Sequence, residues 1–150
     1  MNTFRGSILA IEAQESIALI DVALGSHRLC ATVLGSAAAQ ANWRLGQNVQ
    51  LMFNEMEVAL AKNFQGQISL RNRLPGKITQ LEFGKILTRV EFLLAPVEEC
   101  AEPCVELCSD ILIQAVITTR SARALELAVG DTVLGLVKSN EVNLMAVEGV

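Results

Sequence analysis

Apolar residues recur at every second position over most of this chain, a period that predicts β-strands with one buried face. The clearest runs are IALIDVAL at 17–24 and ILTRVEFLL at 86–94. The predicted strands are, in chain order, 8–12, 17–24, 27–33, 48–53 and 57–61, and then 78–82, 86–94, 111–117, 132–137 and 142–147. Two short helical segments are expected at 36–43 and 121–127, ahead of Gly46 and Gly130.

The order of elements repeats because the sequence itself repeats. Residues 30–60 align with 114–144 without a gap, and seven positions are identical where unrelated chains would share roughly two. The identical pairs are Ala31 with Ala115, Ala38 with Ala122, Gly46 with Gly130, Val49 with Val133, Glu57 with Glu141, Val58 with Val142, and Leu60 with Leu144. Residues 5–12 align with 75–82 at an offset of 70 instead of 84, so the second copy carries an insertion of 84 − 70 = 14 residues. We therefore predict two homologous units, 1–63 and 64–150.

Five short strands and one short helix in each unit predict an all-β protein. Units this short favour a tandem repeat of two OB-fold-like five-stranded barrels, each with a short helix. A flat β-sandwich is the alternative, and it is less natural for units of this length.

Composition narrows the function classes. Hydrophobic residues make up 51% and charged residues 19%, which is typical of a globular chain. A net charge of −4 disfavours a general nucleic-acid or anionic-membrane surface, and 4% aromatics without Tyr disfavour base stacking. Glu12, Gln14 and Glu15 interrupt the apolar run near the N-terminus, so no signal peptide is predicted. We expect a soluble cytoplasmic protein with reduced thiols and with neither a nucleic-acid nor a membrane partner.

Four short motifs follow one another in the second unit: SLRNRLPGKI at 69–78, ITTRS at 117–121, LAVGDTV at 127–133 and LVKSNEVNLM at 136–145. Their succession resembles the Mop or molbindin repeat, also called the TOBE type, of molybdate-binding proteins. That family pattern runs Ser-x-Arg-Asn-x-Leu-x-Gly, Ile-Thr-x-x-Ser, a Gly before a Val strand, and a Lys-Ala-Ser-like step. The second unit matches nearly every element in order, and the first unit is a divergent copy.

The resemblance implies a site for molybdate, a tetrahedral dianion. Its ligands are then expected to be Ser69, Leu70 (through its backbone), Arg71, Asn72, Thr118, Ser121, Lys138 and Ser139. Lys138 is the side chain expected to neutralise charge. Hydroxyls, backbone N–H groups and an ammonium are donors without a competing carboxylate, which suits an anion taken out of water. Such a site offers no acceptor for the proton of hydrogen phosphate.

The resemblance also implies where the site forms and what it serves. Family sites lie between repeats or subunits, so we expect a homo-oligomer, with a trimer favoured over a dimer. The expected function is non-enzymatic storage or homeostasis of molybdate, with tungstate fitting as well. The alternative is a sensing module that docks to a molybdate transporter ATPase or a molybdate-responsive regulator. No Walker A, GxSxG or HExxH motif points to an enzyme.

The first unit departs from the pattern at the aligned ligand positions. It has Leu34, Ala37, Asn54 and Glu55 where the second has Thr118, Ser121, Lys138 and Ser139. It also begins at Met1, too late to hold its own Ser-x-Arg-Asn segment. We expect a structural partner with at most a weakened site.

The insertion places Cys100, Cys104 and Cys108 at successive spacings of four, with Pro103 between them. Three thiolates could hold a soft metal ion, and they are the candidate metal ligands of this chain. Four glutamates in the same stretch would raise the pKa of these thiols, and CxxC pairs are absent, so an acidic hairpin loop is favoured. His27, the single histidine, is expected in a loop and indicates neither a metal site nor a nucleophile–base pair.

Overall fold

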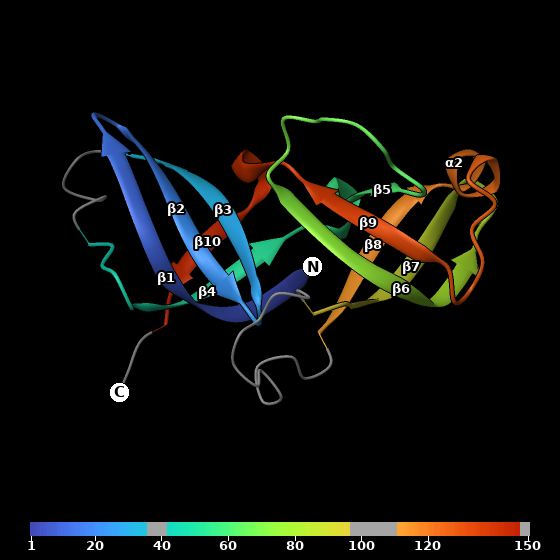
Figure 1. Ribbon diagram of the computed structural model, residues 1–150, viewed down its shortest axis with the longest axis horizontal. Helices are drawn as coiled ribbons and strands as arrows, with labels where there is room; N and C mark the ends of the chain where they lie inside the picture. The colour runs from blue at the N-terminus through green and yellow to red at the C-terminus, as the bar shows by residue number, and fades with distance from the viewer. Residues whose placement is uncertain (36–41, 97–110, 148–150) are drawn as a thin grey trace.

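Two curled five-stranded antiparallel sheets lie side by side along the long axis of the molecule (Figure 1). This architecture comes from a computed structural model, which describes residues 1–35, 42–96 and 111–147. The predicted all-β class, with two OB-fold-like barrels and a short helix, is confirmed. No helix among the described residues is long and apolar enough to span a bilayer.

Each sheet contains four strands of one predicted unit and the last strand of the other predicted unit. The first sheet has the order β10-β4-β1-β2-β3 and the second β5-β9-β6-β7-β8. The strands of the first are β1 (Asn2–Gln14), β2 (Ile17–Leu24), β3 (His27–Leu34), β4 (Asn48–Phe53) and β10 (Asn143–Ala146). Those of the second are β5 (Ala59–Ala61), β6 (Asn72–Phe83), β7 (Leu87–Leu94), β8 (Leu112–Thr118) and β9 (Thr132–Val137). Short helical turns are η1 (Glu55–Glu57), α2 (Thr119–Ala124) and η2 (Ser139–Glu141).

The exchanged strands are β5 and β10. Ala59–Ala61, the last strand of the predicted first unit, pairs with β9 of the second sheet. Asn143–Ala146, the last strand of the predicted second unit, pairs with β4 of the first sheet. A cut at residue 63 would therefore remove a strand from each sheet.

The hydrophobic core follows from the period-two pattern. Along β2 the alternate residues Ile20, Val22 and Leu24 are buried. The cores of both sheets join into one cluster, in which Phe53 and Phe92 are among the largest fully buried side chains. Alternation set by the pleat thus places one face of each sheet inside.

Two strands begin earlier than the sequence pattern predicts. β1 starts at Asn2 and β6 at Asn72, six residues before the predicted starts, because their first halves pair with β4 and β9. Pro75 and Gly76 therefore lie inside β6 and do not form a turn. A Cβ on Gly76 would stand 2.4 Å from the Leu93 carbonyl oxygen, so β6 and β7 can approach closely only with glycine there.

The helix predicted at 121–127 is present but begins two residues earlier, at Thr119. The Thr118 hydroxyl accepts a hydrogen bond from the Ser121 backbone N–H at 3.2 Å and caps the helix, which fixes its start. Most of the helix predicted at 36–43 lies outside the described residues.

Candidate functional site

The eight predicted ligand residues fall into two groups. In the first group, Ser69, Leu70 and Arg71 lie in the link between β5 and β6, Asn72 begins β6, and Lys138 and Ser139 follow β9. Asn72 is in register with Val137, so Arg71 and Lys138 flank the same end of this strand pair. Thr118 and Ser121 form the second group, at α2.

Asn72 is a buried bridge between the two sheets. Its side chain is 1% exposed, and its amide oxygen accepts from the Cys30 backbone N–H at 2.7 Å. Its amide nitrogen donates to the Cys30 carbonyl oxygen at 2.8 Å. These two bonds fix the start of β6 against the outer edge of β3, so the Asn72 side chain positions the neighbouring loop.

Ser139 lies on the same strand edge. Its hydroxyl is 2.8 Å from the Thr32 hydroxyl, and Thr32 is two residues beyond Cys30 along β3. The Asn72 and Ser139 contacts are therefore about 7 Å apart along β3. Lys138 is exposed and caps η2 without a side-chain hydrogen bond, so its ammonium extends towards solvent beside Ser139.

Arg71 lines a cavity of about 280 Å³ together with Arg28, Asp21, Cys30 and Asn72. Arg28 donates to one Asp21 carboxylate oxygen at 2.9 Å from Nε and 2.7 Å from Nη2. This pairing neutralises the carboxylate and leaves the Arg71 guanidinium as excess positive charge. Burial, and next its hydrogen bond to Asp21, raise the pKa of the Cys30 thiol above its ordinary value, while Arg71 opposes the rise.

The loop before β6 is held by an arginine outside the predicted ligand set. Arg73 donates from Nε to the Leu70 carbonyl oxygen at 3.2 Å and from Nη2 to the Ile68 carbonyl oxygen at 3.1 Å. Ser69 and Arg71 remain exposed on this loop. Arg73 thus shapes the backbone that presents them.

Thr118 and Ser121 lie far from the first group within one chain. The Thr118 hydroxyl donates to the Ser121 hydroxyl at 2.9 Å, and both side chains are exposed. Thr118 is in register with Leu87, next to the hairpin that follows β6, whereas Asn72 starts β6 at its other end. The 12 residues of β6 extend on the order of 36 Å. One chain therefore cannot bring both groups to a single small ion.

The Asn72 bridge has a counterpart that the sequence-based reasoning missed. The Asn2 amide nitrogen donates to the Gln114 carbonyl oxygen at 2.8 Å, and the Asn2 amide oxygen accepts from the Gln114 backbone N–H at 2.8 Å. Asn2 aligns with Asn72 at the offset of 70, and Gln114 aligns with Cys30 at the offset of 84. The first unit thus keeps the Asn of the Ser-x-Arg-Asn motif, and the repeat offsets could have identified it.

The other first-unit residues that align with predicted ligands lack the hydroxyl and ammonium donors of the predicted anion site. Leu34, aligned with Thr118, is 75% exposed, and Asn54, aligned with Lys138, caps η1 by accepting from the Met56 N–H at 2.8 Å. Glu55, aligned with Ser139, contacts the Met1 ammonium, and this contact lowers the pKa of its carboxyl. Ala37 lies outside the described residues. A carboxylate therefore stands where the second unit has a hydroxyl donor.

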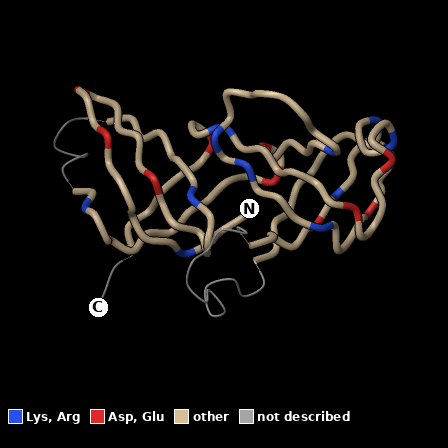
Figure 2. The backbone as a smooth tube through the Cα atoms, viewed as in Figure 1, with Lys and Arg blue, Asp and Glu red and all other residues tan. Residues whose placement is uncertain are grey.

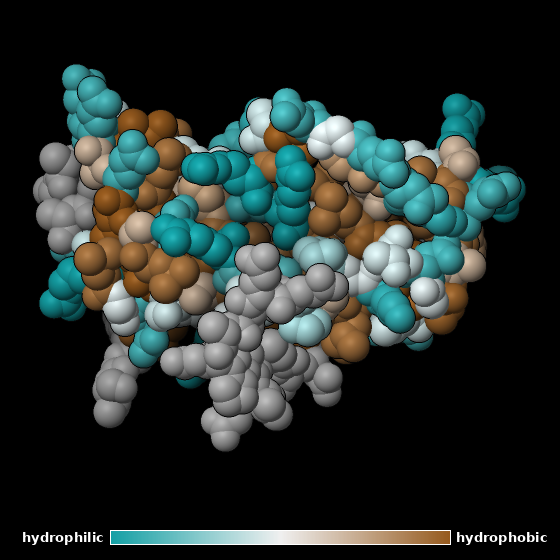
Figure 3. All heavy atoms as spheres, in the orientation of Figure 1, coloured by the Kyte–Doolittle hydropathy of each residue, from teal (hydrophilic) through white to brown (hydrophobic). Residues whose placement is uncertain are grey.

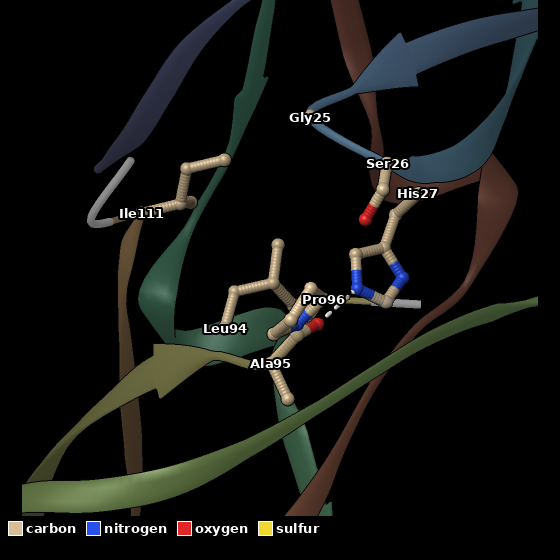
Figure 4. Close-up of a pocket in the computed structure, with 7 residues that line it drawn as sticks. All are labelled: Gly25, Ser26, His27, Leu94, Ala95, Pro96 and Ile111. Atoms are coloured by element: carbon tan, nitrogen blue, oxygen red, sulfur yellow. Dashed lines mark hydrogen bonds between the residues drawn. The ribbon is translucent and has the colours of Figure 1, made fainter. Parts of the chain in front are cut away.

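His27 was expected in a loop but is the first residue of β3 and is buried at 9% exposure. Its Nε2 lies 2.5 Å from the Ala95 carbonyl oxygen, across the seam between the two sheets (Figure 4). The cavity beside it, lined also by Leu94, Pro96 and Ile111, has a volume of about 10 Å³. That space holds no more than about one water, so this seam is packed and is not a ligand site.

The described part of the chain has no group of three or more His, Cys, Asp or Glu side chains that could bind a metal ion. Cys100, Cys104 and Cys108 lie outside the described residues, as does most of the predicted acidic loop. Among the described residues on either side of this stretch, the Leu94 N–H donates to the Ile111 carbonyl at 2.9 Å.

Three comparisons with known proteins give two matches. Residues 1–60 match the TOBE domain family model. A search of curated proteins finds no match. Among solved structures, the chain is similar to a crystal form of the cytoplasmic molybdate-binding protein ModG with molybdate bound. The two share 22% sequence identity at a TM-score of 0.82 over 97% of this chain and 95% of that one. The chain therefore has the ModG fold, and the family match falls on the unit that resembles the Mop pattern less.

Proposed function

We propose that this chain, which has a TOBE domain at residues 1–60 and the fold of ModG, binds molybdate in the cytoplasm for storage or homeostasis. The ModG structure contains molybdate, and this chain covers 95% of it. The observation that carries the proposal is the exposure of the motif's hydroxyls and cations at two places on the second sheet. Arg71 and Lys138 form one place, and Thr118 and Ser121 form the other.

The proposed site forms between two copies of the chain. Because β6 separates the two groups by on the order of 36 Å, the Arg71 group of one copy must meet the Thr118 group of another. A ring of copies satisfies this arrangement, since each copy offers one group to each neighbour. A closed ring of three is the assembly we favour.

Roles within the proposed site follow from the contacts of each residue. Lys138 and Arg71 supply positive charge, and the Ser69, Ser121 and Thr118 hydroxyls supply donors. Asn72 has both amide atoms bonded to Cys30, so its role is to position the loop. Four or five charge-assisted bonds of about 1.5–3 kcal/mol each support a net binding free energy near −8 kcal/mol, a micromolar Kd, after the cost of association.

Apolar surface supports association of copies. Large hydrophobic side chains are exposed on both sheets, among them Leu9 and Ile17 on the first and Phe83, Ile86 and Leu93 on or beside the second. Figure 3 shows apolar patches between hydrophilic side chains over much of one face. Exposed apolar area of this kind is typical of surfaces that contact another protein.

Titration calorimetry with molybdate tests the proposal, with tungstate, sulfate and phosphate titrated in parallel. Saturable heat with molybdate and tungstate, and none with phosphate, is the expected result. The variants Lys138→Ala and Thr118→Ala with Ser121→Ala should each weaken binding at least tenfold, and Lys77→Ala, an exposed cation on β6, should not. Absence of molybdate binding by the unmodified protein would refute the proposal.

A further inference from the structure

The Thr118 end of the second sheet carries a cavity that the ligand motif does not explain. Its volume is about 540 Å³, and it is lined by Lys85, Ile86, Thr118, Thr119, Arg120 and Arg123. Three of these six residues are cations, and no lining residue is acidic. The cavity therefore presents a positive surface around one of the predicted ligand residues.

The three cations are available to a ligand. Lys85, Arg120 and Arg123 are all exposed, and none of them forms an ion pair or a side-chain hydrogen bond with any residue in the described ranges. Basic positions cluster on the helix at this end of the molecule (Figure 2). In a chain with a net charge of −4, three unpaired cations around one cavity are a local excess of positive charge.

The walls of the cavity are fixed to one another. The Thr119 backbone N–H donates to the Ile86 carbonyl at 2.8 Å, and the Thr119 hydroxyl donates to the Gly84 carbonyl at 2.9 Å. The buried Thr88 hydroxyl lies 2.9 Å from the Thr119 hydroxyl. These bonds tie the hairpin that carries Lys85 to the turn that carries Arg120, so the cations are presented by a pre-organised backbone.

The first unit offers an internal comparison, because it repeats one of these backbone hydrogen bonds but has an acidic residue at the position of Lys85. The Gly35 N–H donates to the Ser16 carbonyl at 2.9 Å, at positions that align with Thr119 and Ile86. At the hairpin, Glu15 aligns with Lys85 at the offset of 70. The fold itself therefore does not require Lys85, and the charge at this position belongs to the second unit.

We propose that Lys85, Arg120 and Arg123 supply the positive charge that binds the oxyanion on the Thr118 side of its site. The inference deepens the proposed function and rests on it. It shifts part of the charge neutralisation from Lys138 to three residues that are not among the expected ligands, of which Arg120 occupies a variable position of the Ile-Thr-x-x-Ser motif. The ligand class is a tetrahedral oxyanion with two negative charges, because three cations within one cavity favour a divalent over a monovalent anion.

The test compares molybdate binding by two triple variants with the same change in net charge. One is Lys85→Ala, Arg120→Ala, Arg123→Ala, and the control is Arg44→Ala, Lys77→Ala, Arg89→Ala, which removes three exposed cations elsewhere. We expect the first triple variant to weaken binding at least tenfold and to reduce its dependence on salt, and the control to change it less than threefold. A charge-keeping variant, Lys85→Arg, Arg120→Lys, Arg123→Lys, should stay within threefold of the unmodified protein.

The outcomes separate the two proposals. Molybdate binding that is unchanged in the first triple variant overturns the role of these cations and leaves the proposed function standing. If the unmodified protein does not bind molybdate, the proposed function fails. Titration with sulfate and with phosphate then tests whether the cavity binds any oxyanion. Binding of either anion that the first triple variant loses would support the cavity as an oxyanion site, and no binding of any of the three would overturn it.

Discussion

Replacing Asn72 by Ala should destabilise the protein by removing the bridge between its two sheets. The substitution deletes hydrogen bonds of 2.7 and 2.8 Å and leaves the Cys30 N–H and carbonyl without these partners. The position is 1% exposed, and each orphaned backbone group costs about 1–3 kcal/mol when water cannot reach it. We expect a loss of about 3 kcal/mol in the free energy of unfolding, and a fall in Tm of roughly 6–12 °C.

Urea unfolding and calorimetry measure this loss, with two matched variants. Asn143→Ala removes an exposed asparagine from β10 and should stay within about 0.5 kcal/mol of the unmodified protein. Asn2→Ala removes the counterpart bridge to Gln114 and should resemble Asn72→Ala. The two losses should add to within about 0.5 kcal/mol, since the bridges share no partner. An Asn72→Ala protein whose free energy of unfolding lies within about 0.5 kcal/mol of the unmodified one would show that this bridge does not stabilise the protein.

Three further predictions concern the fold. Gly76→Ala should cost about 1–3 kcal/mol in urea unfolding, because its Cβ would meet the Leu93 carbonyl oxygen at 2.4 Å; no loss would contradict the close approach of β6 and β7. The pKa of Asp131 is lowered chiefly by a hydrogen bond from Lys62, so this carboxylate stabilises the protein above its ordinary pKa of 3.8, and the effect is lost as pH falls through the lowered value. In Lys62→Met, an NMR titration should find the Asp131 pKa closer to its ordinary value; an unchanged pKa would contradict the assignment. Deleting 143–150 removes β10 from the edge of the first sheet, and hydrogen exchange should then be faster in β4 than in β7; equal protection of the two strands would contradict this pairing.

The sequence pattern predicted most strands correctly because side-chain alternation reports directly on burial. Ile20, Val22 and Leu24 show this in β2, where all three are buried as their spacing indicates. The same pattern cannot say which sheet a strand joins. The apolar positions of β10 alternate in the same way in either sheet, so its exchange into the first sheet appears only in its pairing with β4, for example of Asn143 with Met52.

The sequence predicted which residues form the candidate site, but it did not predict where these residues lie in the folded chain. The motif identified Arg71, Lys138 and Thr118 as donors without placing them. Their separation along β6 depends on strand pairing, which the spacing in sequence does not encode. The structural role of Asn72 could not be predicted either. Its partners are the backbone N–H and carbonyl of Cys30, which every residue type except proline has, so the residue at position 30 does not indicate the contact.

Whether two copies of the chain share one molybdate site can be decided by mixing two variants. One variant carries Arg71→Ala and Lys138→Ala, and the other carries Thr118→Ala and Ser121→Ala, so each lacks one of the two groups. The two are titrated with molybdate separately and after co-refolding into mixed oligomers. We predict weak binding by each alone and restored high-affinity sites in the mixture, where an intact group of one copy faces an intact group of another. A mixture that binds no better than the average of its two components would contradict the shared site.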